Sequence, residues 1–213
     1  MTEERARCPL KIVSESDPDV VLALPARVVP VRHARSTLIL ASIESVRQRG
    51  LFEQYESALA EAHRETLLGA IAATWIPIEA AHAHYAACDS LGLTPEQQAQ
   101  SGRATFDSAR ATLLGTAVRM ATRSSGVTPW QAVPLFQLFW NRGFDGGGVS
   151  VVRVGPKDWN TTIVQAPLRD SPYFKNGLRG LHAALVELFC TKAYVTERRA
   201  KTPGSIVLRV QWA

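Results

Sequence analysis

Residues 173–212 read YFKNGLRGLHAALVELFCTKAYVTERRAKTPGSIVLRVQW, and this stretch decides the fold. Its first part spaces apolar residues four, three, four and three positions apart, which places them on one face of a helix: Phe174, Leu178, Leu181, Leu185 and Leu188. Its last part alternates large apolar with mostly polar side chains, as expected for a strand with one buried face. The stretch therefore predicts a helix over 173–190 and strands at 193–196 and 205–212.

Two further strands precede this helix. Residues 149–154 and 161–166 are rich in Val, Ile and Thr, and Gly155-Pro156 marks the turn between them. The hydrophobic period changes from near 3.6 to 2 after Asn141. Residues 142–213 are therefore predicted to form a ββαββ unit with an antiparallel sheet.

The part of the chain before Asn141 is predicted to be mostly helical. Residues 1–30 look extended and interrupted by prolines, whereas residues 31–141 carry helical spacing. Thr94-Pro-Glu-Gln97 and Thr128-Pro-Trp-Gln131 both have the form of a capping box, and the helix after the first is predicted to run through Met120. We expect an α+β fold, one domain over 1–213 in which an N-terminal helical half packs on the ββαββ half.

Composition is that of an ordinary globular protein, with 46% hydrophobic and 20% charged residues. The three cysteines are far apart in the sequence and form no C-x-x-C motif, so a disulfide framework is not expected. The N-terminus lacks the apolar core of a secretory signal. The apolar stretch at 20–29 contains Pro25 and is too short to span a bilayer. These features predict a cytoplasmic protein, and they leave its oligomeric state open.

Positive charge is concentrated in the C-terminal part. Residues 142–213 hold eleven Lys+Arg and five Asp+Glu, a net +6, against −1 for residues 1–141. One interpretation is a surface for nucleic acid. The favoured interpretation is charged strand edges that discourage aggregation, because the basic residues have no interleaved aromatics.

No catalytic motif can be identified, and no catalytic or metal-binding residue is predicted. The glycine-rich run at 143–148 is followed by a strand and by no Lys-Ser/Thr, so it is predicted to be a flexible loop and not a phosphate cradle. His84 and Cys88 are helical i,i+4 neighbours, but His82 lies on another face, and structural zinc needs four ligands. A lone histidine such as His82 or His84 is the residue type that could ligate haem.

An aromatic cluster near residue 135 is the best candidate for a site. Trp130, Phe136, Phe139 and Trp140 crowd one predicted helix, and the last three share a face. Core packing is the simpler interpretation. The alternative is an apolar pocket between this helix and the sheet.

Three segments carry a family resemblance: Trp75-Ile-Pro-Ile-Glu-Ala-Ala-His-Ala-His-Tyr-Ala-Ala-Cys-Asp-Ser-Leu-Gly-Leu-Thr94, Pro172-Tyr-Phe-Lys-Asn-Gly-Leu-Arg-Gly180 and Val210-Gln-Trp212. Together they resemble an uncharacterised myxobacterial family known only as a domain of unknown function. The C-terminal ββαββ segment, with its Gly177-x-x-Gly180 helix, also resembles the haem-nitric-oxide-binding, 4-vinyl-reductase and TRAPP-type superfamily. That resemblance implies a ligand sensor or an assembly subunit. The chain lacks the Tyr-x-Ser-x-Arg motif of the haem sensors and the cysteine cluster of the reductase-type domains, which argues against haem and zinc.

These observations favour a non-enzymatic sensory or adaptor domain. It is predicted to bind a small apolar ligand or a partner protein where the helices meet the sheet, through Trp130, Phe136, Phe139, Trp140, His82 and His84. Two alternatives are a nucleic-acid-binding protein that uses the basic C-terminal part, and an enzyme with an unrecognised site. No cofactor is predicted, with haem as the exception to test.

Overall fold

The computed structural model describes residues 19–110 and 128–213. Along the chain the elements are β1 (Val20–Leu22), β2 (His33–Arg35), α1 (Ser36–Gln48), α2 (Phe52–Ala58), α3 (Glu61–Leu68), β3 (Trp75–Pro77), α4 (Ile78–Asp89), α5 (Pro95–Arg110), the 3₁₀ helix η1 (Pro129–Ala132), α7 (Val133–Gly143), β4 (Gly148–Gly155), β5 (Asp158–Val164), α8 (Pro172–Val186), β6 (Ala193–Arg198) and β7 (Ile206–Trp212). The predicted extended segment before residue 19, and the predicted helix from 111 to Met120, lie outside the described residues.

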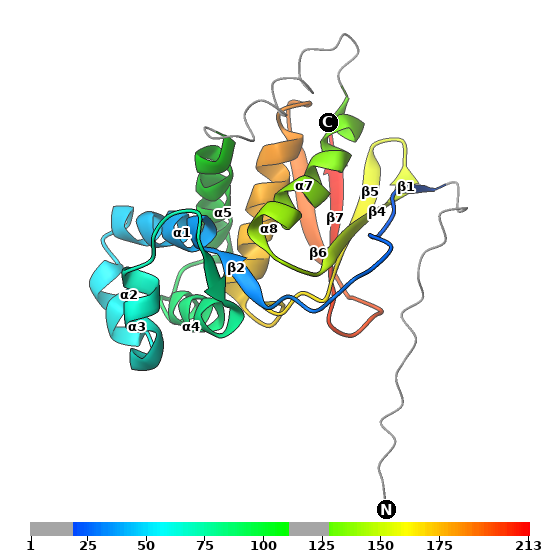
Figure 1. The fold of residues 1–213 in the computed structure, drawn as a ribbon. Coiled ribbons are helices and arrows are strands. Elements are labelled where there is room, and N and C mark those ends of the chain that lie inside the picture. Colours follow the sequence, from blue (N-terminus) through cyan, green and yellow to red (C-terminus); the bar gives the residue numbers. More distant parts are fainter. Residues whose placement is uncertain (1–18, 111–127) are drawn as a thin grey trace, which may run out of the picture.

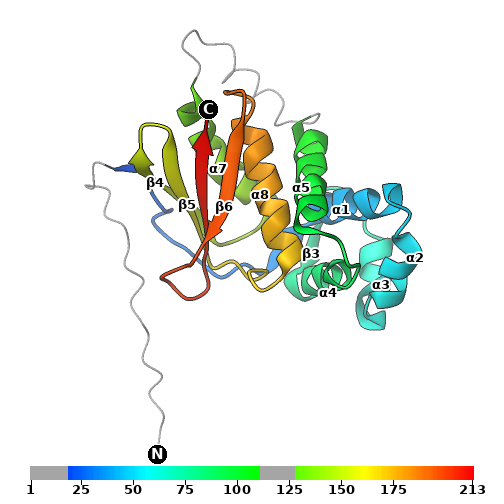
Figure 2. The same ribbon diagram turned by 180° about the vertical axis from the view of Figure 1, so that it is seen from behind.

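The C-terminal half is the predicted ββαββ unit (Figure 1). Its strands form an antiparallel sheet in the order β1-β4-β5-β7-β6, so β1 joins the unit as an edge strand beside β4. Val149, Trp159, Ile163, Leu208 and Val210 are buried on the inner face. α7 and α8 lie against that face, and Figure 2 shows the opposite face, where the strands lie in front of the helices. The fold class is therefore α+β, as predicted.

The helical half lies beside α8, and its contact with α8 is made by glycines. α5 runs along α8 in both views (Figures 1 and 2). A Cβ on Gly102 would lie 1.9 Å from the carbonyl oxygen of Gly177, and one on Gly180 would lie 1.8 Å from that of Ala99. The two backbones therefore touch. Gly177 and Gly180 of α8 therefore face α5.

Local signals in the helical half are confirmed in part. Thr94 and Gln97 form the predicted capping box: the Gln97 amide donates to Thr94 Oγ1 at 3.3 Å and the Thr94 amide to Gln97 Oε1 at 2.9 Å. The matching box at Thr128 does not form; η1 follows it, and α7 begins only at Val133, with Pro134 in its first turn. His33, where a helix was expected, opens the short strand β2, which pairs with β3.

The glycine-rich run at 143–148 is held in place by several contacts. The Asp145 carboxylate accepts from the backbone amides of Arg32 and His33 at 2.8 and 2.9 Å. The Trp140 indole donates to the Gly146 carbonyl at 2.7 Å, and the Gly147 amide donates to the Val29 carbonyl at 2.8 Å. This run therefore fastens the N-terminal segment to the end of α7, in contrast to the flexible loop that its composition predicted.

Buried apolar residues of both halves form one cluster, from Ile39 and Ile43 of α1 to Leu208 and Val210 of β7. Within the described ranges, no helix has the length and apolar character needed to cross a membrane.

The glycine contact predicts an asymmetric response to substitution. Gly102→Ala places a methyl group inside the backbone of Gly177, so we expect a loss of about 2–3 kcal/mol of unfolding free energy, toward the upper end of typical overpacking costs. Gly177→Ala is the matched control, because its Cβ would meet nothing closer than 4.0 Å. Alanine also favours the helix by up to about 1 kcal/mol, so this variant should be neutral or more stable. Urea unfolding of both variants is the measurement, and equal losses would contradict the contact.

Candidate functional site

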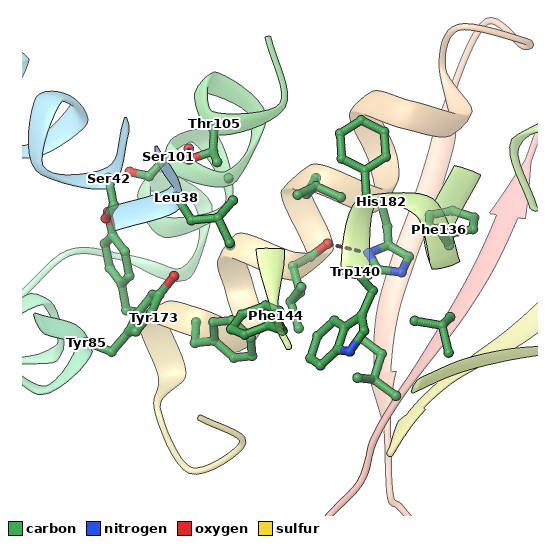
Figure 3. A pocket seen from close by; sticks show the side chains of 18 residues that line it. Leu38, Ser42, Tyr85, Ser101, Thr105, Phe136, Trp140, Phe144, Tyr173 and His182 are labelled. Atoms are coloured by element: carbon green, nitrogen blue, oxygen red, sulfur yellow. Dashed lines mark hydrogen bonds between the residues drawn. The ribbon is translucent and has the colours of Figure 1, made fainter. Parts of the chain in front are cut away.

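A pocket lies where the helical half meets the sheet half (Figure 3). Its volume is about 90 Å³, and its wall comes from α1, α4, α5, α7, α8 and the inner face of β4 and β5. Gly102 and Gly177 belong to the wall, so the glycine contact between α5 and α8 also bounds the pocket. Most of the lining side chains are aliphatic or aromatic.

Three of the four predicted aromatic residues line the pocket. Phe136, Phe139 and Trp140 lie on one face of α7, as their spacing predicted, and Phe136 and Trp140 are buried. Phe139 packs against Phe106 of α5 at 5.4 Å between ring centroids, and Trp140 against Phe144 at 4.4 Å. One end of the pocket is therefore aromatic.

Trp130 lies apart from the pocket wall. It belongs to η1, a separate turn before α7, and its ring packs 5.2 Å from those of Trp159 and Trp212. The Arg153 guanidinium lies 4.7 Å above its centroid. Trp130 thus closes the core at another part of the sheet. The sequence grouped it with Phe136 because it could not show that the helix is interrupted between them.

The other end of the pocket carries hydroxyl groups. Figure 3 shows Ser42, Tyr85, Ser101 and Tyr173 on the side away from His182. Ser42 is within hydrogen-bonding distance of the Tyr173 hydroxyl, at 3.1 Å, and of His84 Nε2, at 3.0 Å. His84 Nδ1 lies 2.9 Å from the Tyr55 hydroxyl. These side chains form a buried chain that joins α2, α4, α1 and α8.

The contacts of His84 are those of a residue that stabilises the fold. It is fully buried behind the pocket wall, and both ring nitrogens have hydroxyl partners. Burial lowers the pKa of His84 to about 3, so the ring is neutral. Cys88 Sγ lies 3.7 Å from His84 Nε2, but within residues 19–110 and 128–213 no three His, Cys, Asp or Glu side chains gather in a way that could hold a metal ion. His82 is exposed on the outer side of α4, away from both.

His182 is the polar residue of the aromatic end, and the sequence did not single it out. It lies on α8, is 3% exposed, and stacks on Phe136 with 4.4 Å between centroids and 17° between planes. Its Nδ1 is 2.8 Å from the Leu178 carbonyl. The sequence could have indicated that His182 is buried, because it lies four residues after Leu178 and three before Leu185, on the apolar face of the predicted helix.

The pocket as it stands does not fit a haem group. Its volume of about 90 Å³ is well below the roughly 300–1,000 Å³ of pockets that hold drug-sized molecules. The imidazole that lines it, His182, lies flat against Phe136, which covers one side of the ring. A macrocycle would need these packed side chains to separate.

Comparison with known proteins supports the fold and nothing finer. No family model matches the chain, and no curated protein matches it, so the resemblance to a myxobacterial family stays a prediction. Solved structures do match. The Fe(II) unliganded H-NOX protein from K. algicida superimposes with a TM-score of 0.62 at 7% identity, over 84% of this chain and 96% of that one. An oxygen-binding H-NOX domain related to soluble guanylate cyclases, in its oxygen complex, gives 0.54 at 12% identity, over 84% and 94%.

The chain is thus an α+β protein with a pocket between its helices and its sheet. More particularly, it has an H-NOX-like fold. The likeness extends over both halves, beyond the C-terminal ββαββ unit on which the sequence resemblance rested. At these identities it shows the fold alone.

The small pocket predicts weak interaction with haem. Hemin added to the purified protein should give the absorbance spectrum of free hemin, without a saturable Soret shift, because the pocket volume is too small. A His182→Ala variant serves as the reference for non-specific binding. A stoichiometric Soret band that disappears in His182→Ala would contradict this expectation.

The two buried imidazoles predict acid sensitivity. Burial lowers the pKa of His182 to about 4 and that of His84 to about 3, against 6.5 for an ordinary histidine. Between pH 6.5 and about 4 the unfolded chain binds more protons, so stability is full above this window and falls as the pH decreases through it. The slope should approach about 1.4 kcal/mol per pH unit for each imidazole.

Urea unfolding across this pH window is the measurement. His182→Phe should lower the slope by up to about 1.4 kcal/mol per pH unit, because it removes one buried imidazole and leaves the other titrating groups in place. His82→Gln, at an exposed position, is the control substitution. If the unfolding free energy of His182→Phe had the same pH slope as that of the unmodified protein, the fold would not be holding the His182 imidazole neutral.

Proposed function

We propose that this chain is a sensory domain that binds a small apolar molecule in the pocket between α7, α8 and the sheet. The observation that carries the proposal is the pocket itself, an apolar cavity at the contact between the two halves of the fold. A ligand there touches α5 and α8 of opposite halves at once. Its binding free energy can therefore bias how the halves sit against each other, which is what a sensor needs.

The size of the pocket limits the ligand. An apolar cavity near 150 Å³ accepts benzene or xenon, so about 90 Å³ suits a molecule no larger than one small ring. The solved structures with this fold include an oxygen-binding H-NOX domain in its oxygen complex, so a small ligand is bound by at least one protein of this fold.

A small ligand is favoured over a partner protein. Phe136 and Trp140 are 3% and 5% exposed, so the predicted aromatic face points inward and offers little to a docking surface. Trp130, which is partly exposed, already holds Arg153 over its ring. The adaptor interpretation therefore has less support at these residues.

The two alternatives also have less support. Cationic residues of the C-terminal half form ion pairs within the fold, such as Lys175 with Glu197 and Arg209 with Asp158, which reduces the charge available to nucleic acid. For an enzyme, the described pocket wall contains no Asp or Glu, and its serine hydroxyls lie at the end away from His182 (Figure 3). A base and a nucleophile are therefore not brought together there.

Filling the pocket tests the proposal. Val149→Phe adds a ring to the inner face of β4 within the pocket wall, and Val154→Phe adds the same ring to the 50% exposed end of that strand. With benzene as the probe, thermal unfolding should shift upward in the unmodified protein and in Val154→Phe, because a ligand that binds only the folded state stabilises it. Val149→Phe should show no shift.

Backbone amide NMR of the same three proteins checks the location. Benzene should move resonances of α7 and α8 in the unmodified protein. No shift in any of the three proteins, or equal shifts in Val149→Phe and Val154→Phe, would mean that the pocket is not a ligand site.

A further inference from the structure

His182 has one ring nitrogen whose hydrogen-bonding role is fixed by the fold. Nδ1 lies 2.8 Å from the Leu178 carbonyl, which can only accept, so Nδ1 carries the proton. Nε2, the far end of the ring from the helix backbone, is then an acceptor with a free lone pair. The protein sets this tautomer before any ligand arrives.

Nε2 has no donor among the residues that the structure describes. The atom is fully buried, and nothing within residues 19–110 and 128–213 donates to it. Leaving a buried polar atom unsatisfied costs about 1–3 kcal/mol. The ring cannot easily turn to relieve this cost, because it stacks on Phe136 and is tied to Leu178. His182 lines the aromatic end of the pocket (Figure 3). Its Nε2 is covered by neighbouring atoms, so a ligand in the pocket reaches this acceptor when a neighbouring side chain shifts.

Water is a poor partner for this nitrogen. A buried water typically makes about three hydrogen bonds. The Trp140 indole N–H is already donated to the Gly146 carbonyl, and Phe136 has no polar atom to offer. A water on Nε2 would have one good partner at this end of the pocket, and an organic donor with an apolar body suits it better.

The other residues of the pocket wall determine the charge and polarity that a ligand can have. Ser42 and Tyr173 are within hydrogen-bonding distance of each other, and Ser45 donates to Ser101 at 2.9 Å, so these hydroxyls already have partners. The described wall contains no Asp, Glu, Lys or Arg to balance a charge. Burying an unpaired charge there would be costly, so a neutral molecule is required.

We propose that the ligand is a neutral, mainly apolar molecule of at most one small ring that carries a single hydroxyl or N–H, which it donates to Nε2 of His182. This inference rests on the pocket being the ligand site. It adds a chemical class to that proposal: an alcohol, a phenol or a similar donor, in preference to a pure hydrocarbon.

Phenol and toluene form a matched pair of probes, since a hydroxyl replaces a methyl group. Their affinities are measured by NMR titration for the unmodified protein, for His182→Phe and for His82→Phe. His182→Phe keeps a ring for Phe136 to stack on but removes the acceptor. Comparing the phenol-to-toluene affinity ratio between variants cancels the different hydration of the two free probes.

We expect this ratio to fall at least about tenfold in His182→Phe, which is about 1.4 kcal/mol. It should be unchanged in His82→Phe, where the substituted side chain is exposed on α4. In the unmodified protein, the ¹⁵N resonance of His182 Nε2 should move when phenol binds and stay when toluene binds. That second measurement requires no variant, so it holds even if His182→Phe does not fold.

The outcomes separate the two proposals. If both probes bind but the ratio is the same in His182→Phe and the Nε2 resonance does not move with phenol, the donor inference is wrong and the pocket remains a ligand site. If neither probe binds the unmodified protein, the proposed function is wrong and the donor inference is wrong with it.

Discussion

The contact of α5 with α8 is the constraint on which the rest of this structure depends. Two helices from different halves of the chain touch backbone to backbone at Gly102 and Gly177, and again at Ala99 and Gly180. Helix axes are usually 8–10 Å apart, with side chains between them, and glycines allow a closer approach. This approach places α1 and α4 in the wall of the same pocket as β4 and β5. The aromatic side chains of α7 and α8 then enclose the space that remains, which is the pocket.

A buried hydrogen-bonded chain holds the helical half in register with this contact. Tyr55, His84, Ser42 and Tyr173 come from four helices, and each satisfies a neighbour. A chain of this kind specifies one packing of the helices, because any other would leave buried polar atoms without partners. It also ends at the pocket, since Ser42 and Tyr173 belong to the pocket wall. A ligand that displaced Tyr173 would disturb partners as far away as α2.

The two buried histidines show how context gives one residue type different roles. His84 has a hydroxyl partner on each nitrogen, so nothing in its surroundings calls for a ligand. His182 has a backbone partner on Nδ1, and its Nε2 has no partner within residues 19–110 and 128–213. The residue lines an apolar pocket. Burial keeps both rings neutral. Only the second lines the pocket and keeps an acceptor without a partner among the described residues, and the proposal for ligand chemistry therefore concerns this residue.

The sequence by itself determined the α+β class, the order of the ββαββ elements, the buried face of α8 and the capping box at Thr94, because periodicity and caps are properties of neighbouring residues. It also placed Phe136, Phe139 and Trp140 on one face. The tertiary structure decided that the α8 glycines meet α5 and that Trp130 packs on Trp159. It also decided that His182, unlike His84, has a ring nitrogen without a partner among the described residues. Each of these depends on which atoms from distant segments come within a few ångströms of each other, and local spacing carries no information about that.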